Sequence, residues 1–439
     1  MATRMAEHPA GKISEVFTDA AERQGAYDFL EHRDSHAVKI RQAIVAHTAK
    51  QAAVHEFAYV ALDGTALTFT DRKQSKGLGN VGPVEINRRG LKVVSALAMA
   101  PDGQVIGLCG QQTWSRKSTG RSEKQAKRDG RNFPTSAKET QHTLDVIEQT
   151  AALFERHGTK GCFLIDRAGD AREVLFALRS RGQSFIIRGQ QNRLLDGAKK
   201  RYLREQMPRR PVLGTYTFVV KASHDRPAGK LKMSVRAARM TLCLRTPRGK
   251  NPTSFEVSVV LAKSVAGPAH VEWLLLTDRI VNSSDAARDV IAGYATRWRI
   301  EEFHKTWKTG GCNVEDSQLR SIGAIETWPT LHAVVAARIE RLKKRSREEG
   351  DLPASVEFSA VEIEALIAFK SQRTPARKAS KMPSLQQATL WIAELGGYTG
   401  KSSGGPPGSI TIGRGLETLR WIVVGTTLRQ STYGIKSDQ

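Results

Sequence analysis

Five side chains suited to binding a phosphate group recur at helical spacing between residues 294 and 308. The side chains on one helical face, the first four within about 60° of one another, are Tyr294, Arg297, Glu301, Lys308 and Lys305. The apolar residues that point the opposite way are Ile300, Phe303 and Trp307. A carboxylate can hold a cation, while guanidinium, ammonium and phenol groups donate to phosphate oxygens. The spacing predicts a helix that presents a metal-bound phosphate site on one face, with a solvated, salt-bridged helix as the alternative.

Two aspartates end apolar segments that have the character of buried strands. Asp63 follows YVAL and Asp166 follows CFLI. A strand end holds a metal ligand accurately, although an aspartate in that position is more often a turn or helix cap. The other acids of this region are less suitable, since Asp71 and Asp129 do not end a buried strand and Asp170 is expected to cap a helix.

The contiguous segment YATRWRIEEFHKTWKTG resembles the Y-R-E-K signature of bacterial transposases of the insertion-sequence-four family, Tn-five type. Residue type and spacing match at Tyr294, Arg297, Glu301 and Lys308. Patches from QGAYDFL near the start to WIAELGG at 391–397 extend the resemblance over nearly the whole chain. It implies a ribonuclease-H-like core with three metal-binding carboxylates. On this basis the expected catalytic residues and metal ligands are Asp63, Asp166 and Glu301.

The same resemblance implies the partners of this site. Two Mg²⁺ ions, with Mn²⁺ as a substitute, would serve phosphoryl transfer on double-stranded DNA. The residues expected to contact DNA are Tyr294, Arg297, Lys305, Lys308 and Trp273. The last of these, in VEWLLLT, resembles a family tryptophan that stacks on a flipped base, and its alternative is a core position on a strand. His304 is expected to be structural.

The implied activity is cut-and-paste DNA transposition. A strand would be nicked at each transposon end, the freed 3′-hydroxyl would form a hairpin, and the hairpin would be reopened before strand transfer into target DNA. Family members act as dimers that bridge two DNA ends, so a homodimer is expected. A bacterial cytoplasmic, nucleoid-associated location follows from the same resemblance.

The charge of the chain agrees with a polyanionic partner. With 68 basic and 44 acidic residues the net charge is +24, an excess that favours nucleic acid. A membrane surface is the competitor, but the sequence contains no apolar run of transmembrane length and no signal peptide. The four cysteines, Cys109, Cys162, Cys243 and Cys312, lack the spacing of a zinc site and suit a reducing compartment.

The order of predicted elements gives an α/β fold, a ribonuclease-H-like core with a mixed five-stranded sheet and flanking helices. Three antiparallel strands come first, the first ending at Asp63 and the other two joined by a turn at 101–103. A basic loop at 115–131 precedes helix, strand, helix and strand. The last helix is expected to begin at Gly415, after a Gly/Pro/Ser-rich loop.

Five regions are expected. They are an N-terminal helical DNA-binding remnant (1–56), the first part of the core (57–189), an all-β insertion (190–281), the second part of the core with the Y-R-E-K helix (282–348), and a C-terminal helical dimerisation region (349–439). The RQGAYDFL patch lies closer to the start than in family members, which place an end-binding helical stretch before it. Two alternatives to an active transposase therefore stay open: an N-terminally truncated inhibitor of transposition, and a host-adopted nuclease or DNA-binding protein of the same fold.

Overall fold

The computed structural model describes residues 1–7, 9–32, 37–82, 88–116, 138–197, 199–220, 227–245, 252–373, 382–400 and 405–433. Most of the predicted basic loop at 115–131, with Asp129, lies outside these ranges. None of the described helices is long and apolar enough to cross a membrane.

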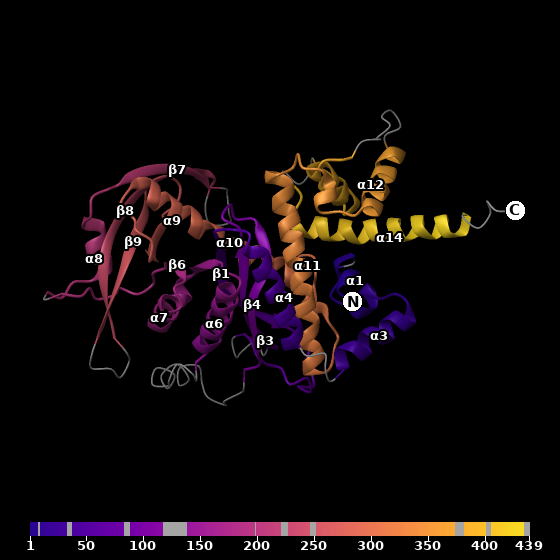
Figure 1. Ribbon diagram of the computed structural model, residues 1–439, viewed down its shortest axis with the longest axis horizontal. Helices are drawn as coiled ribbons and strands as arrows, with labels where there is room; N and C mark the ends of the chain where they lie inside the picture. Colours follow the sequence, from indigo (N-terminus) through magenta and orange to yellow (C-terminus); the bar gives the residue numbers. More distant parts are fainter. Residues whose placement is uncertain are drawn as a thin grey trace.

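One mixed sheet runs through the middle of the molecule (Figure 1). Its strands are β1 (Phe57–Thr68), β2 (Gly79–Asn80), β3 (Arg89–Met99), β4 (Val105–Trp114), β5 (Lys160–Ile165), β6 (Ser184–Arg188), β7 (Gly214–Val220), β8 (Gly229–Leu244), β9 (Thr253–Ala266) and β10 (Glu272–Thr277). The order is β2-β3-β1-β5-β6-β10-β9-β8-β7, with β4 paired to β3. Only the β1–β5 and β5–β6 pairs are parallel.

The described helices lie on both faces of this sheet and at one end of it (Figure 1). They are α1 (Ala2–Glu7), α2 (Ile13–Val16), α3 (Ala20–Glu31), α4 (Ala37–Ala52), α6 (Thr140–Arg156), α7 (Arg172–Ser180), α8 (Leu203–Gln206), α9 (Ser284–Thr296), α10 (Trp298–Lys308), α11 (Ile322–Glu348), α12 (Ala360–Arg373), α13 (Leu385–Leu395) and α14 (Ser409–Tyr433). Ser283 caps α9 by accepting from the Ala286 amide.

Alternation along β1 divides the core between the two faces of the sheet. Tyr59 and Ala61 belong to the cluster that α9, α10 and α11 complete, whereas Val60 and Leu62 belong to the cluster beneath α6 and α7. Asp63 continues the first set, and in β5 Asp166 continues the series of Cys162 and Leu164. Both aspartates therefore fall on the face that α10 covers.

Three predicted boundaries are wrong. β1 does not end at Asp63 but continues to Thr68, because its antiparallel pairing with β3 persists after the parallel pairing with β5 has stopped at Leu62. The expected single helix is divided at Arg297 into α9 and α10, with 3-10-type hydrogen bonds on both sides. The last helix begins at Ser409, six residues earlier than Gly415.

The predicted five-stranded sheet is present as β4, β3, β1, β5 and β6, but it is half of a larger one. β10 pairs antiparallel with β6 through Leu275 and Arg188, so the strands of the predicted insertion continue the same sheet. The hairpin between β3 and β4 is confirmed, with Gly103 at a φ of 81° in the turn.

Candidate active site

The sheet brings Asp63 and Asp166 to the same edge. The parallel register pairs Leu62 with Ile165, so the two aspartates are the next residues on adjacent strands. Both line a cavity of about 260 Å³ at the carboxyl end of these strands. Side chains at this end of parallel strands converge, which is the usual position of a site in an α/β sheet.

Local hydrogen bonds orient both carboxylates. The Gly64 amide donates to Asp63 Oδ1 at 2.9 Å, and the Ala168 amide donates to Asp166 Oδ1 at 2.9 Å. Asp166 thereby caps the 3-10 turn Arg167–Gly169 that follows β5. Each aspartate keeps its second oxygen for another partner.

Helix α10 carries Glu301 over this edge, but Glu301 does not join the aspartates directly. The guanidinium of Arg297, one turn earlier, pairs with Glu301 and stands 4.0 Å from Asp63 Oδ2. Among the described residues, no three His, Cys, Asp or Glu side chains form a group that could hold a metal ion. The two aspartates fit the hard oxygen ligands that Mg²⁺ takes, whereas Glu301 is paired with Arg297.

Negatively charged groups lie close together at this edge and shift the pKa of Asp63. Burial, followed by the charge of Asp166, raises the pKa of Asp63 to about 6, with a smaller contribution from Glu301. Arg297 acts in the opposite direction. A strongly perturbed carboxyl group in a cavity is typical of a functional site.

His304 packs between α10 and the sheet instead of lying at the edge of the exposed face. Its Nδ1 is 3.9 Å from Asp63 Oδ2, and only 6 % of the residue is exposed. Burial, with the nearby charges of Lys308 and Arg297, lowers the pKa of His304 to about 3, so the ring is neutral near pH 7.

The predicted DNA-contacting side chains do not share one surface. Tyr294 is 4 % exposed and packs edge-on against Trp273, with ring centroids 5.3 Å apart. Lys308 pairs with Glu315 at 3.6 Å, and Lys305 is exposed on the side of α10 toward α11 and α14. Helical spacing predicted that these residues share one exposed helical face. This prediction is wrong for Tyr294, because Trp273 of β10 packs against it.

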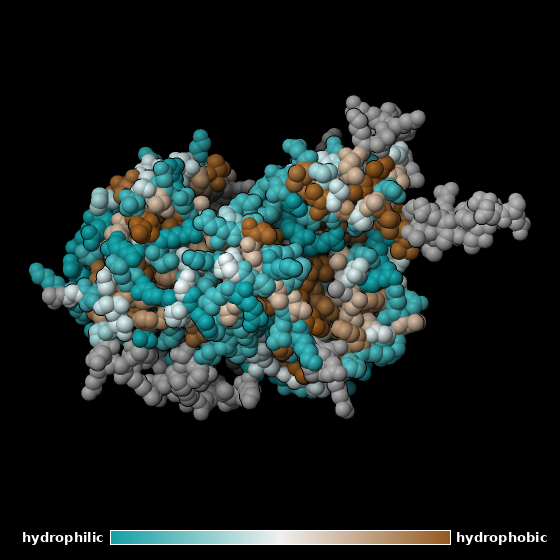
Figure 2. All heavy atoms as spheres, in the orientation of Figure 1, coloured by the Kyte–Doolittle hydropathy of each residue, from teal (hydrophilic) through white to brown (hydrophobic). Residues whose placement is uncertain are grey.

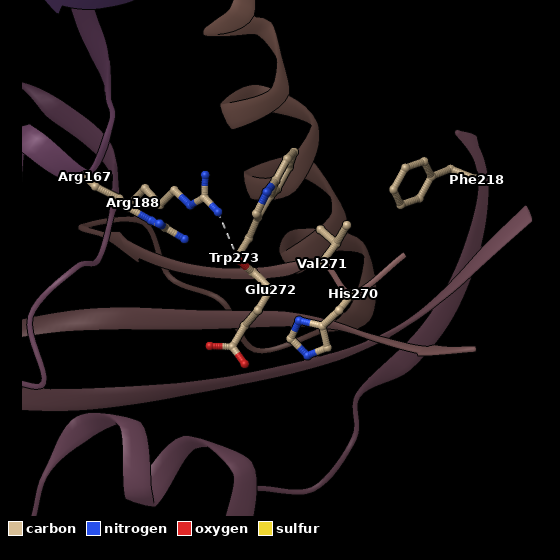
Figure 3. A pocket seen from close by; sticks show the side chains of 7 residues that line it. All are labelled: Arg167, Arg188, Phe218, His270, Val271, Glu272 and Trp273. Carbon is tan, nitrogen blue, oxygen red and sulfur yellow. Dashed lines mark hydrogen bonds between the residues drawn. The ribbon is translucent and has the colours of Figure 1, made fainter. Parts of the chain in front are cut away.

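Trp273 lines a cavity of about 570 Å³ next to the aspartate edge (Figure 3). The Arg188 guanidinium lies beside the indole and donates to the Glu272 carbonyl at 3.2 Å, and Arg167 follows directly after Asp166. Sequence reasoning missed both arginines. The signal was present, since Arg188 ends the strand SFIIR at the same edge as Asp63 and Asp166.

Two other acids are structural. Asp170 does not cap α7 as expected, but accepts from the Gln190 and Gln191 amides and forms a buried ion pair with Arg193 at 2.5 Å. Asp71 accepts from the Ser75 amide at 3.0 Å and lies 3.9 Å from Arg89.

A family model described as Transposase DDE domain matches residues 97–337, more than half of the chain. The chain therefore belongs to this family of transposases. The matched range contains Asp166 and Glu301 and begins after Asp63. Domains of this family generally use divalent metal ions and act on DNA.

Proposed function

We propose that the chain is a cut-and-paste DNA transposase of the insertion-sequence-four family, with Asp63, Asp166 and Glu301 as its catalytic carboxylates. The observation that carries this proposal is the β1–β5 register, which puts two aspartates side by side near α10, the helix that carries Glu301. The elevated pKa of Asp63 supports it, because a cation would relieve that concentration of charge.

The carboxylates have distinct tasks in this proposal. Asp63 and Asp166 offer their second oxygens to divalent cations, and Glu301 completes the set after Arg297 has turned to a DNA phosphate. When bound, two Mg²⁺ ions, or Mn²⁺ in their place, lower the pKa of a nucleophilic water and neutralise charge at phosphorus. His304 is neutral and buried, and its part is to support the Asp63 side chain.

The DNA contacts follow the two sides of α10. Arg297 and Lys308 hold phosphates beside the scissile bond. Tyr294 positions two arginines, since Arg297 lies over its ring and Arg188 interacts with its hydroxyl group. Trp273 offers its indole to an unpaired base in the cavity where Arg167 and Arg188 balance the phosphate charge. Lys305 contacts the backbone on the other side.

The reaction consists of successive phosphoryl displacements. Water attacks phosphorus at the transposon end and the 3′-oxygen leaves as a hydroxyl. That hydroxyl attacks the opposite strand, forming a hairpin and releasing the flanking DNA. A second water opens the hairpin, and the regenerated 3′-hydroxyl attacks a target phosphodiester. One set of carboxylates suffices, since every step exchanges one oxygen for another at phosphorus.

The remaining regions supply binding and assembly. Residues 1–56 are proposed to contact the transposon end, and 349–439 to form the dimer contact. Helix α14 projects from the body of the molecule (Figure 1), and apolar residues gather on the visible face over the C-terminal helices (Figure 2). Trp421 on this helix is 44 % exposed, which suits a surface that a second copy covers.

Cleavage of a labelled duplex carrying the inverted repeats beside the gene tests the proposal. In Mg²⁺ the chain should nick the end and yield a hairpin, and Glu301→Gln should do neither. Arg299→Gln, on the same helix but paired with Glu302, is the matched control. Cleavage by Glu301→Gln at the parent rate contradicts the catalytic assignment. Inhibition of an active relative without cleavage of its own identifies an inhibitor.

A further inference from the structure

A third cavity adjoins Glu301 on the side of α10 that faces α11 and α14. Its volume is about 610 Å³, and Glu301, Lys305 and Arg347 line it together with the first residues of α14. It shares no lining residue with the cavity of Trp273. Trp298 stands at its rim with 61 % of the residue exposed. Glu301 therefore lines this cavity and not the cavity of Trp273.

The basic groups at this third cavity are of two kinds. Lys343, which lines the cavity, pairs with Glu302 and Glu340, and the nearby Arg299 pairs with Glu302. Within the described ranges, Lys305 and Arg347 have no carboxylate partner, and the one contact found for Arg347 is its donation to the Pro407 carbonyl at 2.7 Å. Two unpaired cations beside a carboxylate attract a phosphodiester.

The wall of the cavity is held in place by buried polar contacts. Glu340 accepts from Thr306 Oγ1 at 2.5 Å and from Ser409 Oγ at 2.6 Å, which joins α10, α11 and the start of α14. Lys343 Nζ donates to Ser409 Oγ at 3.2 Å and to Glu302 at 3.3 Å. Because these groups are satisfied by one another, the cavity keeps its shape without a ligand.

We propose that this cavity binds the sugar–phosphate backbone of a second DNA segment, the target duplex, while the Trp273 cavity receives the transposon end. The inference rests on the proposed function, in which two DNA molecules must reach one set of carboxylates. Lys305 and Arg347 contact target phosphates, and Glu301 lies between the two DNA segments. Flanking donor DNA has the same backbone chemistry and is the alternative source that the experiment must distinguish.

Fluorescence anisotropy on the full chain tests this assignment. The protein is first saturated with unlabelled end duplex, and a labelled duplex of unrelated sequence is then titrated at several salt concentrations. We expect Lys305→Gln/Arg347→Gln to lower the affinity for the unrelated duplex by about tenfold. The slope of the logarithm of affinity against the logarithm of salt concentration should become shallower by about 2, since each phosphate contact contributes about 0.9 to that slope. The loss for labelled end duplex alone should be smaller.

Two further variants separate charge from folding and position. Lys305→Arg/Arg347→Lys keeps both charges and should retain binding, while Arg156→Gln/Lys160→Gln removes two exposed charges at the opposite edge of the sheet. Unchanged binding of the unrelated duplex by Lys305→Gln/Arg347→Gln overturns the inference. A larger loss for the end duplex also overturns it and assigns the cavity to donor DNA. Binding through this cavity without end cleavage would sustain the inference and refute the proposed function.

Discussion

The aspartate edge of the sheet and helix α10 hold their carboxylates by different means. Asp63 and Asp166 are placed by the backbone, since both adjacent strands are paired up to the preceding residue and a main-chain amide fixes one oxygen of each. Glu301 is held by the Arg297 side chain, which an external phosphate can replace.

In the proposed catalytic set, the backbone therefore fixes the positions of two carboxylates, and the position of the third depends on an ion pair. Moving a strand residue requires breaking the sheet, whereas moving Glu301 requires only the exchange of one ion pair, in which the Arg297 side chain is 11 % exposed and that of Glu301 32 %. In the function proposed above, the two aspartates are permanent parts of the site, and Glu301 is expected to join them when DNA is present.

The largest expected effect comes from changing carboxylate length on each side. Asp166→Glu should reduce end cleavage by about 10³-fold or more, roughly 4 kcal/mol of barrier, because the turn after β5 leaves its carboxylate no second position. Glu301→Asp should cost about 10²-fold, since its side chain reorients on the helix. Single-turnover cleavage rates measure both, and equal losses would remove the distinction between strand and helix.

The next-largest effect concerns the ionisation of the Asp63 carboxyl group, whose pKa is raised to about 6. Between the pKa of the unfolded chain, near 4, and that of the folded chain, about 6, Asp63 is protonated in the folded chain and ionised in the unfolded chain. The protonated group therefore stabilises the fold at low pH, and this contribution is lost as the pH rises through about 6. Asp63→Asn should therefore be more stable than the parent at pH 7.5, by on the order of 3 kcal/mol, and equally stable at pH 4.

Thermal unfolding midpoints at the two pH values measure this effect. The control is Asp285→Asn, since that side chain is 80 % exposed and lies in the first turn of α9. A parent protein that gains stability between pH 4 and 7.5 relative to Asp63→Asn would show that Asp63 is ionised and satisfied by Arg297.

A smaller loss is expected from crowding the turn that carries Asp166. A Cβ at Gly169 would lie 2.1 Å from Ile165 Cγ2, so Gly169→Ala must displace the last residue of β5. Overpacking of this kind costs about 1–3 kcal/mol. Chemical denaturation should show that loss with a matching fall in cleavage. Gly25→Ala in α3, where a Cβ meets nothing within 4 Å, should be neutral or slightly stabilising.

The smallest expected effect concerns the ion pair between Arg297 and Glu301 and can be measured without DNA. Arg297→Gln frees Glu301 and removes a positive charge near Asp63, so Mn²⁺ should bind about tenfold more tightly, roughly 1.4 kcal/mol. Electron paramagnetic resonance titration counts free Mn²⁺ directly. Arg299→Gln, which releases only Glu302, should leave the affinity unchanged. An equal gain in both variants would mean that net charge alone, and not Arg297, sets the affinity.

Much of this site was accessible from local pattern. The apolar runs before Asp63 and Asp166 were enough to predict buried strands there, although β1 continues past Asp63 to Thr68. Helical spacing correctly predicted that Ile300, Phe303 and Trp307 are buried. Arg188 was equally predictable, since it ends the apolar strand SFIIR, which pairs in parallel with the strand before Asp166.

Other features had no local signal. Residue spacing does not predict the break at Arg297 or the packing of Trp273, in β10, against Tyr294. It also does not predict the pairing of β10 with β6, which joins the later strands to the predicted five-stranded sheet. Each depends on contacts between segments far apart in the chain, which side-chain periodicity does not encode.

The sequence by itself determined the chemistry: two aspartates after apolar strands, a glutamate among cations on a helix, and a large positive charge. Only the tertiary structure decided how these groups stand toward one another, with Arg297 between Glu301 and Asp63, one cavity beside Trp273 and another along α10. The physical reason is that residue type and period act within one element, whereas charge pairing and cavity shape depend on how elements pack.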